Sequence, residues 1–197
     1  MVPAVRLMPL GSQRLNGRRS VLISIAAGVA VLSAIMTAGP AQARPADDRV
    51  DLTFSGDLVD LAPATLSPFD GAHGRLVMAQ GESGATFVLI LSGISRDAAG
   101  ETFGAHLHTG PCVAGSPWAA GPHYNQSMVT GAVPTAVNDD TEVWLDFTVR
   151  PGGTATSMAR VPFAPTPGDR SVVVHAEATE ENGTAGARLA CLPVSWS

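Results

Sequence analysis

The chain has 197 residues, of which 45% are hydrophobic and 15% charged, and its formal net charge is −5 at pH 7. Four of the twelve basic residues precede residue 44, so the remaining eight, all arginine, face 17 acidic residues and residues 44–197 carry a net charge of about −9. Such an acidic balance argues against nucleic acid or an anionic membrane surface as a partner.

Residues 1–43 have the features of a secretory signal peptide. Four arginines lie before residue 20, an apolar run follows over 21–38, and the segment ends on the A-x-A cleavage signal Ala41-Gln42-Ala43. An apolar run of about 18 residues can also span a bilayer, so a permanent anchor is the alternative. The cleavage signal, with Gly39 and Pro40 before it, favours removal. We therefore expect a secreted or cell-envelope protein, without a membrane segment after cleavage.

The rest of the chain predicts one all-β domain over residues 50–197, after a short flexible lead-in at 44–49. Short apolar or β-branched runs bounded by turn residues predict strands. These runs cover 50–56, 75–80, 85–91, 104–108, 142–149, 157–163, 170–176 and 188–194. Glycine and proline predict loops at 61–74 and 109–138, and no window supports an amphipathic helix. Seven or eight strands of this kind predict a β-sandwich or barrel.

Four of the five histidines and both cysteines fall within a few short motifs in the second half of the chain. His106-Leu107-His108 lies in a predicted strand, where side chains alternate between faces. The two imidazoles therefore share one face, and Leu107 points the other way, into a core. A site rich in imidazole nitrogen suits copper or zinc. The two cysteines, Cys112 and Cys191, most simply form one disulfide in an exported domain.

Taken in order, these motifs resemble those of the copper, zinc superoxide dismutase (SOD) family, over roughly residues 50–193. They are Gly104–His108 (G-x-H-x-H), Cys112, Gly121–Asn125 (G-x-H-[FY]-N), Val173–His175 (V-V-H) and Gly186–Cys191 (G-x-R-x-A-C). The resemblance implies a Greek-key β-sandwich of eight antiparallel strands. It also implies copper ligands at His106, His108, His123 and His175, and a role for Arg188 in attracting the superoxide anion.

The chain departs from the zinc-bearing members of the family in two ways. No histidine lies between Asn125 and His175, so a zinc site of several imidazoles and a carboxylate cannot be assembled. Only twelve residues separate His175 from Arg188, where longer members carry an extended charged loop. Both departures resemble the copper-only branch of the family. We expect copper as the cofactor and no zinc.

His123 matches the residue that bridges copper and zinc in zinc-bearing members. Without zinc, its second nitrogen is free for solvent or a carboxylate, and the histidine can act as a proton source near neutral pH. Resemblance thus makes His123 and Arg188 the catalytic candidates. The alternatives are a loop histidine that never touches metal and a surface arginine paired with Glu180 or Glu181.

Three further residues outside the motifs carry side chains that can bind or orient a ligand. Glu142 and Asp146 are candidates for a carboxylate that orients a ligand histidine, with a plain surface acid as the alternative. His73 lies outside every motif and is expected on a surface loop. The predicted function is an exported copper-dependent superoxide dismutase with superoxide as its substrate. The sequence does not predict an oligomeric state. The alternative is a SOD-like copper-binding protein of the cell envelope without fast turnover, which would have no need of Arg188 as an anion guide.

Overall fold

The computed structural model describes residues 49–197. The predicted signal peptide 1–43 and all of the predicted lead-in except Arg49 lie outside the described residues. Within the described part, no helix is long and apolar enough to cross a membrane.

The regular secondary structure of residues 49–197 consists mainly of antiparallel strands. The strands are β1 (Val50–Asp57), β2 (Val59–Asp60), β3 (His73–Gly81), β4 (Gly84–Ser92), β5 (Thr102–Phe103), β6 (Ala105–His108), β7 (Phe147–Thr148), β8 (Ala155–Val161), β9 (Ser171–His175) and β10 (Arg188–Pro193). The helical elements are the 3₁₀ turns η1 (Arg96–Ala98) and η2 (Pro117–Ala120) and the short helix α1 (Gln126–Thr130). The prediction of an all-β fold is confirmed.

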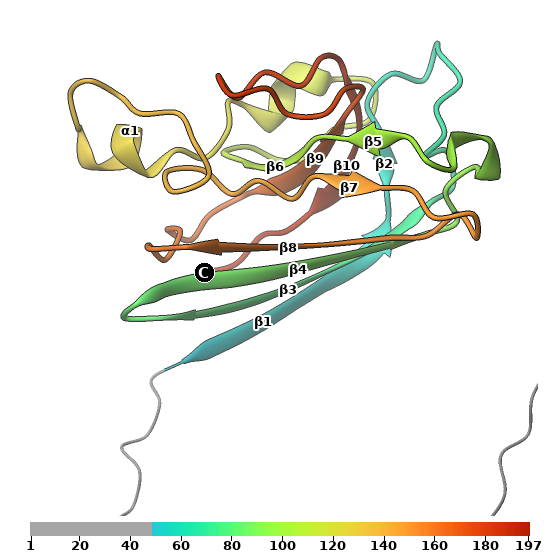
Figure 1. Cartoon of the computed structure of the whole chain (residues 1–197). Helices are drawn as coiled ribbons and strands as arrows, with labels where there is room; N and C mark the ends of the chain where they lie inside the picture. Colours follow the sequence, from blue (N-terminus) through green and yellow to red (C-terminus); the bar gives the residue numbers. More distant parts are fainter. Residues whose placement is uncertain (1–48) are drawn as a thin grey trace, which may run out of the picture. The chain divides into compact units, whose positions relative to one another are not determined.

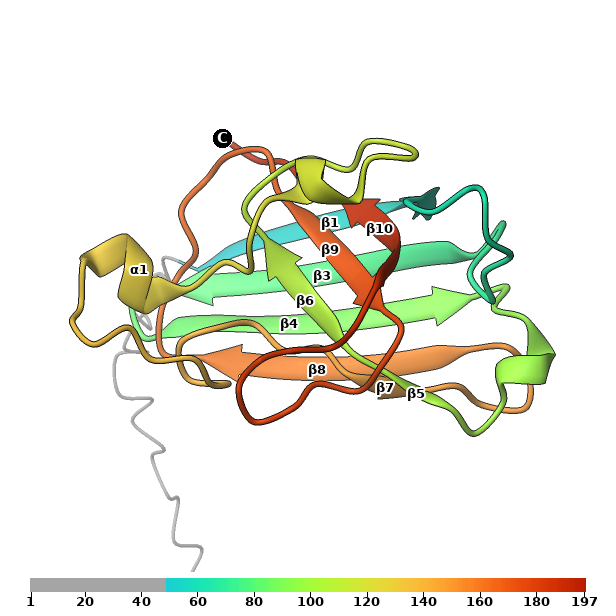
Figure 2. The same ribbon diagram turned by 90° about the horizontal axis from the view of Figure 1, so that it is seen from above.

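Two four-stranded sheets form the sandwich. One has the order β1-β3-β4-β8 and the other the order β2-β10-β9-β6, and β5 pairs with β7 in a separate two-stranded sheet. Figure 1 shows the two larger sheets as stacked layers, and in Figure 2 their strands cross at an angle. The chain passes repeatedly from one sheet to the other, so strands that are far apart in sequence, such as β6 and β9, are neighbours in a sheet.

The hydrophobic core fills the space between the two sheets. In β4, Phe87 and Leu89 are buried with the period of two that an extended strand imposes. Leu107 of β6 and Val174 of β9 face them from the other sheet and belong to the same buried cluster. Each such side chain contributes about 1.5–3 kcal/mol when it is removed from water. The prediction that Leu107 points into the core is confirmed, since 1% of it is exposed.

The segment 142–149 differs from the predicted continuous strand. Its apolar residues Val143, Leu145 and Phe147 are buried in alternation, as the pattern indicates. Its backbone, however, forms isolated bridges to two different segments, and only Phe147–Thr148 pairs as a strand. The prediction of alternating burial is therefore confirmed, and the prediction of a continuous strand is wrong. Alternation of apolar residues determines which side chains are buried, whereas strand hydrogen bonds also require a neighbouring segment to pair with.

Two smaller predictions also need correction. His73 begins strand β3 and does not lie in a loop, although it is exposed as expected. The predicted loop 109–138 contains η2 and the five-residue helix α1. Asn125 caps α1 by accepting a hydrogen bond from the Met128 amide, and Gly131 ends it in the left-handed conformation that glycine adopts freely.

The two cysteines form the disulfide Cys112–Cys191, with a Cα–Cα distance of 5.8 Å and a sequence separation of 79. It joins the loop that follows β6 to the middle of β10. Both segments lead to residues of the candidate site, since His123 follows in the loop and Arg188 begins β10.

Candidate metal centre

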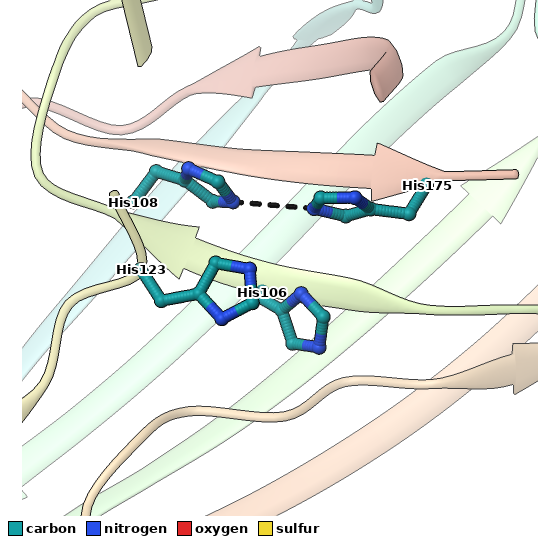
Figure 3. Close-up of side chains that lie close together, drawn as sticks. All are labelled: His106, His108, His123 and His175. Carbon is teal, nitrogen blue, oxygen red and sulfur yellow. Dashed lines mark hydrogen bonds between the residues drawn. The ribbon is translucent and has the colours of Figure 1, made fainter. Parts of the chain in front are cut away.

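Four histidines from three separate segments converge at one end of the second sheet. The structure brings together His106 and His108 of β6, His123 of the loop before α1, and His175 at the end of β9, with one ring nitrogen from each lying within 4.8 Å of the others. Figure 3 shows the four rings turned toward a common centre. The fifth histidine, His73, lies on the first sheet and is not part of the cluster.

Strand pairing explains why these segments meet. In β6, His106 lies opposite Val173 of β9, and His175 follows two residues later on the same face of the sheet as His106 and His108. A single bridge between His108 and His123 brings in the loop. His106 and His108 are fully buried, so the cluster is fixed by the same packing that forms the sheet.

The hydrogen bonds of His108 and His175 assign their protons. His108 Nδ1 lies 3.0 Å from the carbonyl oxygen of Gly121, and His175 Nδ1 lies 3.2 Å from that of Gly186. A carbonyl oxygen only accepts, so each Nδ1 carries the proton and each Nε2 carries a lone pair. The two Nε2 atoms face each other at 3.3 Å, the contact drawn as a dashed line in Figure 3. Two opposed lone pairs at this distance favour a shared cation.

His106 is oriented by a hydroxyl group that is itself held by a carboxylate. Thr179 Oγ1 lies 2.6 Å from Asp146 Oδ1 and 2.7 Å from His106 Nε2. The Asp146 carboxylate accepts only, so the Thr179 hydroxyl donates to it and must accept from His106 Nε2–H. The lone pair of His106 is then on Nδ1, which is buried and has no partner within residues 49–197. A buried nitrogen without a partner is costly unless something binds it.

Gly104 makes the approach of Thr179 possible. A Cβ at position 104 would lie 2.7 Å from the Ala185 Cβ, and 2.9 Å from both the Glu177 carbonyl oxygen and Thr179 Oγ1. Any side chain there would push the 177–185 segment away from His106. The glycine of the G-x-H-x-H motif is therefore explained by close packing next to the site.

Replacing Thr179 by Val, which keeps the shape and removes the hydroxyl, should weaken metal binding at this cluster by about tenfold, because supporting partners of ligand histidines contribute about 10–100-fold to metal affinity. The loss follows from freeing His106 to protonate Nδ1 instead of Nε2. Thr179→Ser keeps the hydroxyl and should retain most of the affinity. Competition against a chelator of known affinity measures both variants, and equal affinity of Thr179→Val and wild type would contradict the role of the hydroxyl.

His123 is oriented by a carboxylate directly. Its Nδ1 lies 2.9 Å from Glu142 Oε2, which also accepts from Trp144 Nε1 at 2.9 Å, while Asn125 Nδ2 donates to Glu142 Oε1 at 2.9 Å. Burial raises the pKa of Glu142, but these three hydrogen bonds outweigh burial and hold the pKa below its usual range. The carboxylate accepts a hydrogen bond from His123 Nδ1–H, and in the neutral imidazole the lone pair then lies on Nε2.

Burial favours the neutral form of His106, His108 and His175. It is the main cause that lowers the pKa of His106, with the neighbouring His123 and His175 adding to the effect. Burial likewise lowers the pKa of His108 to about 2 and that of His175 to about 4. Neutral imidazole is the form that binds a metal ion, so near pH 7 these rings need not release a proton first.

Arg188 lies beside the cluster, directly opposite His175 in the pairing of β9 with β10. Its Nη1 donates to the Pro117 carbonyl oxygen at 2.8 Å, and its guanidinium lies 5.1 Å from the centre of the Trp118 ring. Burial lowers the pKa of Arg188, but a guanidinium stays charged in proteins. Among residues 49–197, no salt bridge neutralises this charge, so the alternative pairing with Glu180 or Glu181 is not seen.

The donor set fits copper. Each of the four imidazoles donates its outer N–H to an oxygen and directs a lone pair inward, and one of the inward nitrogens, His106 Nδ1, is buried without a partner. An all-nitrogen set of imidazoles is of the kind that copper or zinc prefers. The four histidines are thus positioned to hold a metal ion.

Comparison with known proteins agrees at the level of the fold. No family model matches the sequence, and no curated protein matches it. Among solved structures, a double mutant of a SOD-like protein from Bacillus subtilis is 18% identical, covers 72% of this chain and 97% of its own, and superposes with a TM-score of 0.50. The fold is SOD-like. The clock protein EA4 is 16% identical, covers 75% of this chain and 93% of its own, and has a TM-score of 0.49.

Within this SOD-like fold, two residues that contact the site were not anticipated from the sequence. Thr179 and Trp118 belong to none of the motifs, and a lone threonine or a tryptophan in a proline-rich loop carries no signal of its own. Both Glu142 and Asp146 contact the cluster, Glu142 through His123 and Asp146 through the hydroxyl of Thr179.

Proposed function

We propose that this protein is an exported, copper-dependent superoxide dismutase. In this proposal His106, His108, His123 and His175 hold the copper, and Arg188 attracts the superoxide anion. The observation that carries the proposal is the set of four inward-facing imidazole nitrogens next to an unneutralised arginine. The disulfide supports export, because disulfides persist mainly in oxidising compartments.

Copper held by imidazoles supplies one-electron chemistry between Cu(II) and Cu(I), which is what conversion of two superoxide ions and two protons into oxygen and hydrogen peroxide requires. The chain itself supplies binding and orientation. Glu142 accepts a hydrogen bond from His123 Nδ1–H, and the Asp146–Thr179 pair fixes the proton of His106 on Nε2. The further prediction that His123 supplies a proton rests on its side chain being 18% exposed, whereas that of His106 is fully buried.

Arg188 would act over a short range. The acidic net charge of the domain repels an anionic substrate at long range, so attraction must come from a charge close to the cluster. The contact with Pro117 and the stacking on Trp118 hold the guanidinium in place next to His175. A protein that only stores or carries copper gains nothing from a fixed cation there, because the cation also repels the metal.

The test is a dismutation assay on copper-loaded wild type and Arg188→Ala. We expect the wild type to turn over superoxide and Arg188→Ala to be about tenfold slower at low ionic strength with unchanged copper content. The difference should shrink as salt is added, because the Debye length is about 10 Å at 0.1 M salt.

Arg75→Ala is the matched control, since it removes the same charge from an exposed position on β3. It should leave the rate and its salt dependence close to those of the wild type. A wild-type protein that retains copper without turnover would overturn the proposal in favour of a copper-binding protein of the cell envelope. An Arg188→Ala dismutation rate equal to that of the wild type would show that Arg188 does not attract superoxide to the site.

A further inference from the structure

The candidate metal centre opens into a cavity of about 770 Å³. His123 and His175 lie in its wall together with Arg188. This volume falls in the range of roughly 300–1,000 Å³ that is typical of pockets for organic ligands. Superoxide is a diatomic ion, so the proposed function uses a small part of the space.

Most of the cavity wall is apolar. Its carbon-rich side chains come from three segments that surround the cluster, and six of them are Pro117, Trp118, Pro122, Met128, Val137 and Ala185. Met128 and Trp118 are exposed, Trp118 by 81%, in a protein whose other large aromatic side chains are mostly buried. Exposed apolar surface gathered at a cavity marks a place where an apolar group binds.

Close packing holds the two sides of the cavity together. Gly183 has φ +84°, and a Cβ there would lie 2.6 Å from Val137 Cγ1. The absence of a side chain at 183 lets the 182–187 loop reach the segment that carries Val137. This part of the apolar wall is therefore a built feature of the fold, at which two of the three segments are in contact.

The charges in the cavity wall favour an anion. Glu142 is the one carboxylate in the wall, and its oxygens already accept hydrogen bonds from His123, Trp144 and Asn125. Arg188 uses one N–H for the Pro117 carbonyl oxygen, and a guanidinium carries five. The other N–H groups of the Arg188 guanidinium therefore remain available to an anion, next to the ring of Trp118.

We propose that this cavity binds an aromatic carboxylate, with the ring against Trp118 and the apolar wall and the negative charge at Arg188. Aromatic rings stack on tryptophan, and guanidinium groups pair with carboxylates in the same plane. The inference goes beyond superoxide dismutation and needs no metal, because none of the groups that would hold the ligand is one of the four histidines.

The experiment titrates 2-naphthoate into the metal-free purified protein and follows heat release by calorimetry. We expect saturable binding of one molecule per chain below about 1 mM. Trp118→Ala and Arg188→Leu should each weaken it by about tenfold. Met158→Ala, which removes an exposed apolar side chain from β8 away from the cavity, should leave binding unchanged. Circular dichroism checks that each variant is folded.

Two further probes separate charge from ring. Acetate carries the charge without the ring, and 2-naphthalenemethanol carries the ring without the charge, and both should bind at least about tenfold more weakly than 2-naphthoate. Equal binding of the neutral alcohol would overturn the assignment to an anion. Absence of saturable binding, or binding insensitive to both cavity variants, would overturn the site. Because no turnover is measured, either result leaves the proposed dismutase activity to its own test.

Discussion

Replacing His106 by Ala should abolish copper retention, whereas the wild-type protein should hold one copper ion and no zinc per chain. The variant removes the inward nitrogen that is buried without a partner, and one of four imidazoles in the cluster. The loss should exceed the roughly 100-fold that supporting residues contribute, because a donor itself is removed. Elemental analysis after dialysis against a chelator measures both metals.

His73→Ala is the control for this loss. His73 is an exposed histidine on β3 whose side chain contacts Asp57, far from the cluster in the fold. It should retain copper like the wild type. Copper held at one ion per chain by His106→Ala would contradict the assignment of the site, and zinc present beside copper at one ion per chain would contradict the copper-only assignment.

Removing the disulfide should destabilise the protein by about 4 kcal/mol. The bond joins residues 79 apart, and in the chain-entropy model a closed loop of that size restricts the unfolded chain by about 4–5 kcal/mol. The double variant Cys112→Ala with Cys191→Ala avoids placing a polar hydroxyl at the fully buried position 191. Urea unfolding of the metal-free protein measures the free energy of unfolding.

A reducing agent supplies the internal control. It should lower the stability of the wild type to that of the double variant, and it should leave the double variant unchanged. Equal stability of oxidised wild type and double variant would show that the bond does not stabilise the fold. The loop before His123 and the start of β10 should become more mobile on reduction, because the bond ties them together.

Much of the fold follows from local pattern. The alternation of Phe87 and Leu89 in β4 and the placement of Leu107 between two histidines need only the period of an extended strand. The same rule places His106 and His108 on one face. No local stretch of sequence contains the order of the strands in the sheets or the pairing of β6 with β9. These features could be expected only from the resemblance to the superoxide dismutase family.

The supporting groups of the site show where sequence reasoning stops. Thr179 contacts His106 across 73 residues of sequence, and a single threonine in an exposed loop has no distinguishing pattern. Glu142 and Asp146 could be singled out as carboxylates near a strand, but which histidine each would hold depends on how the 142–146 backbone bridges to its neighbours. The cavity likewise depends on contacts between segments, such as that between Gly183 and Val137.

The dispersal of the four histidines along the chain has a thermodynamic consequence. His108 and His175 are 67 residues apart and meet only when β6 pairs with β9, so the unfolded chain offers a metal no comparable set of donors. An ion that binds the native state alone shifts the folding equilibrium by mass action, by about 4 kcal/mol at a free concentration a thousand times its Kd. Under the proposed function, metal occupancy and resistance to unfolding would therefore be linked quantities, and a chain without its ion would open more often.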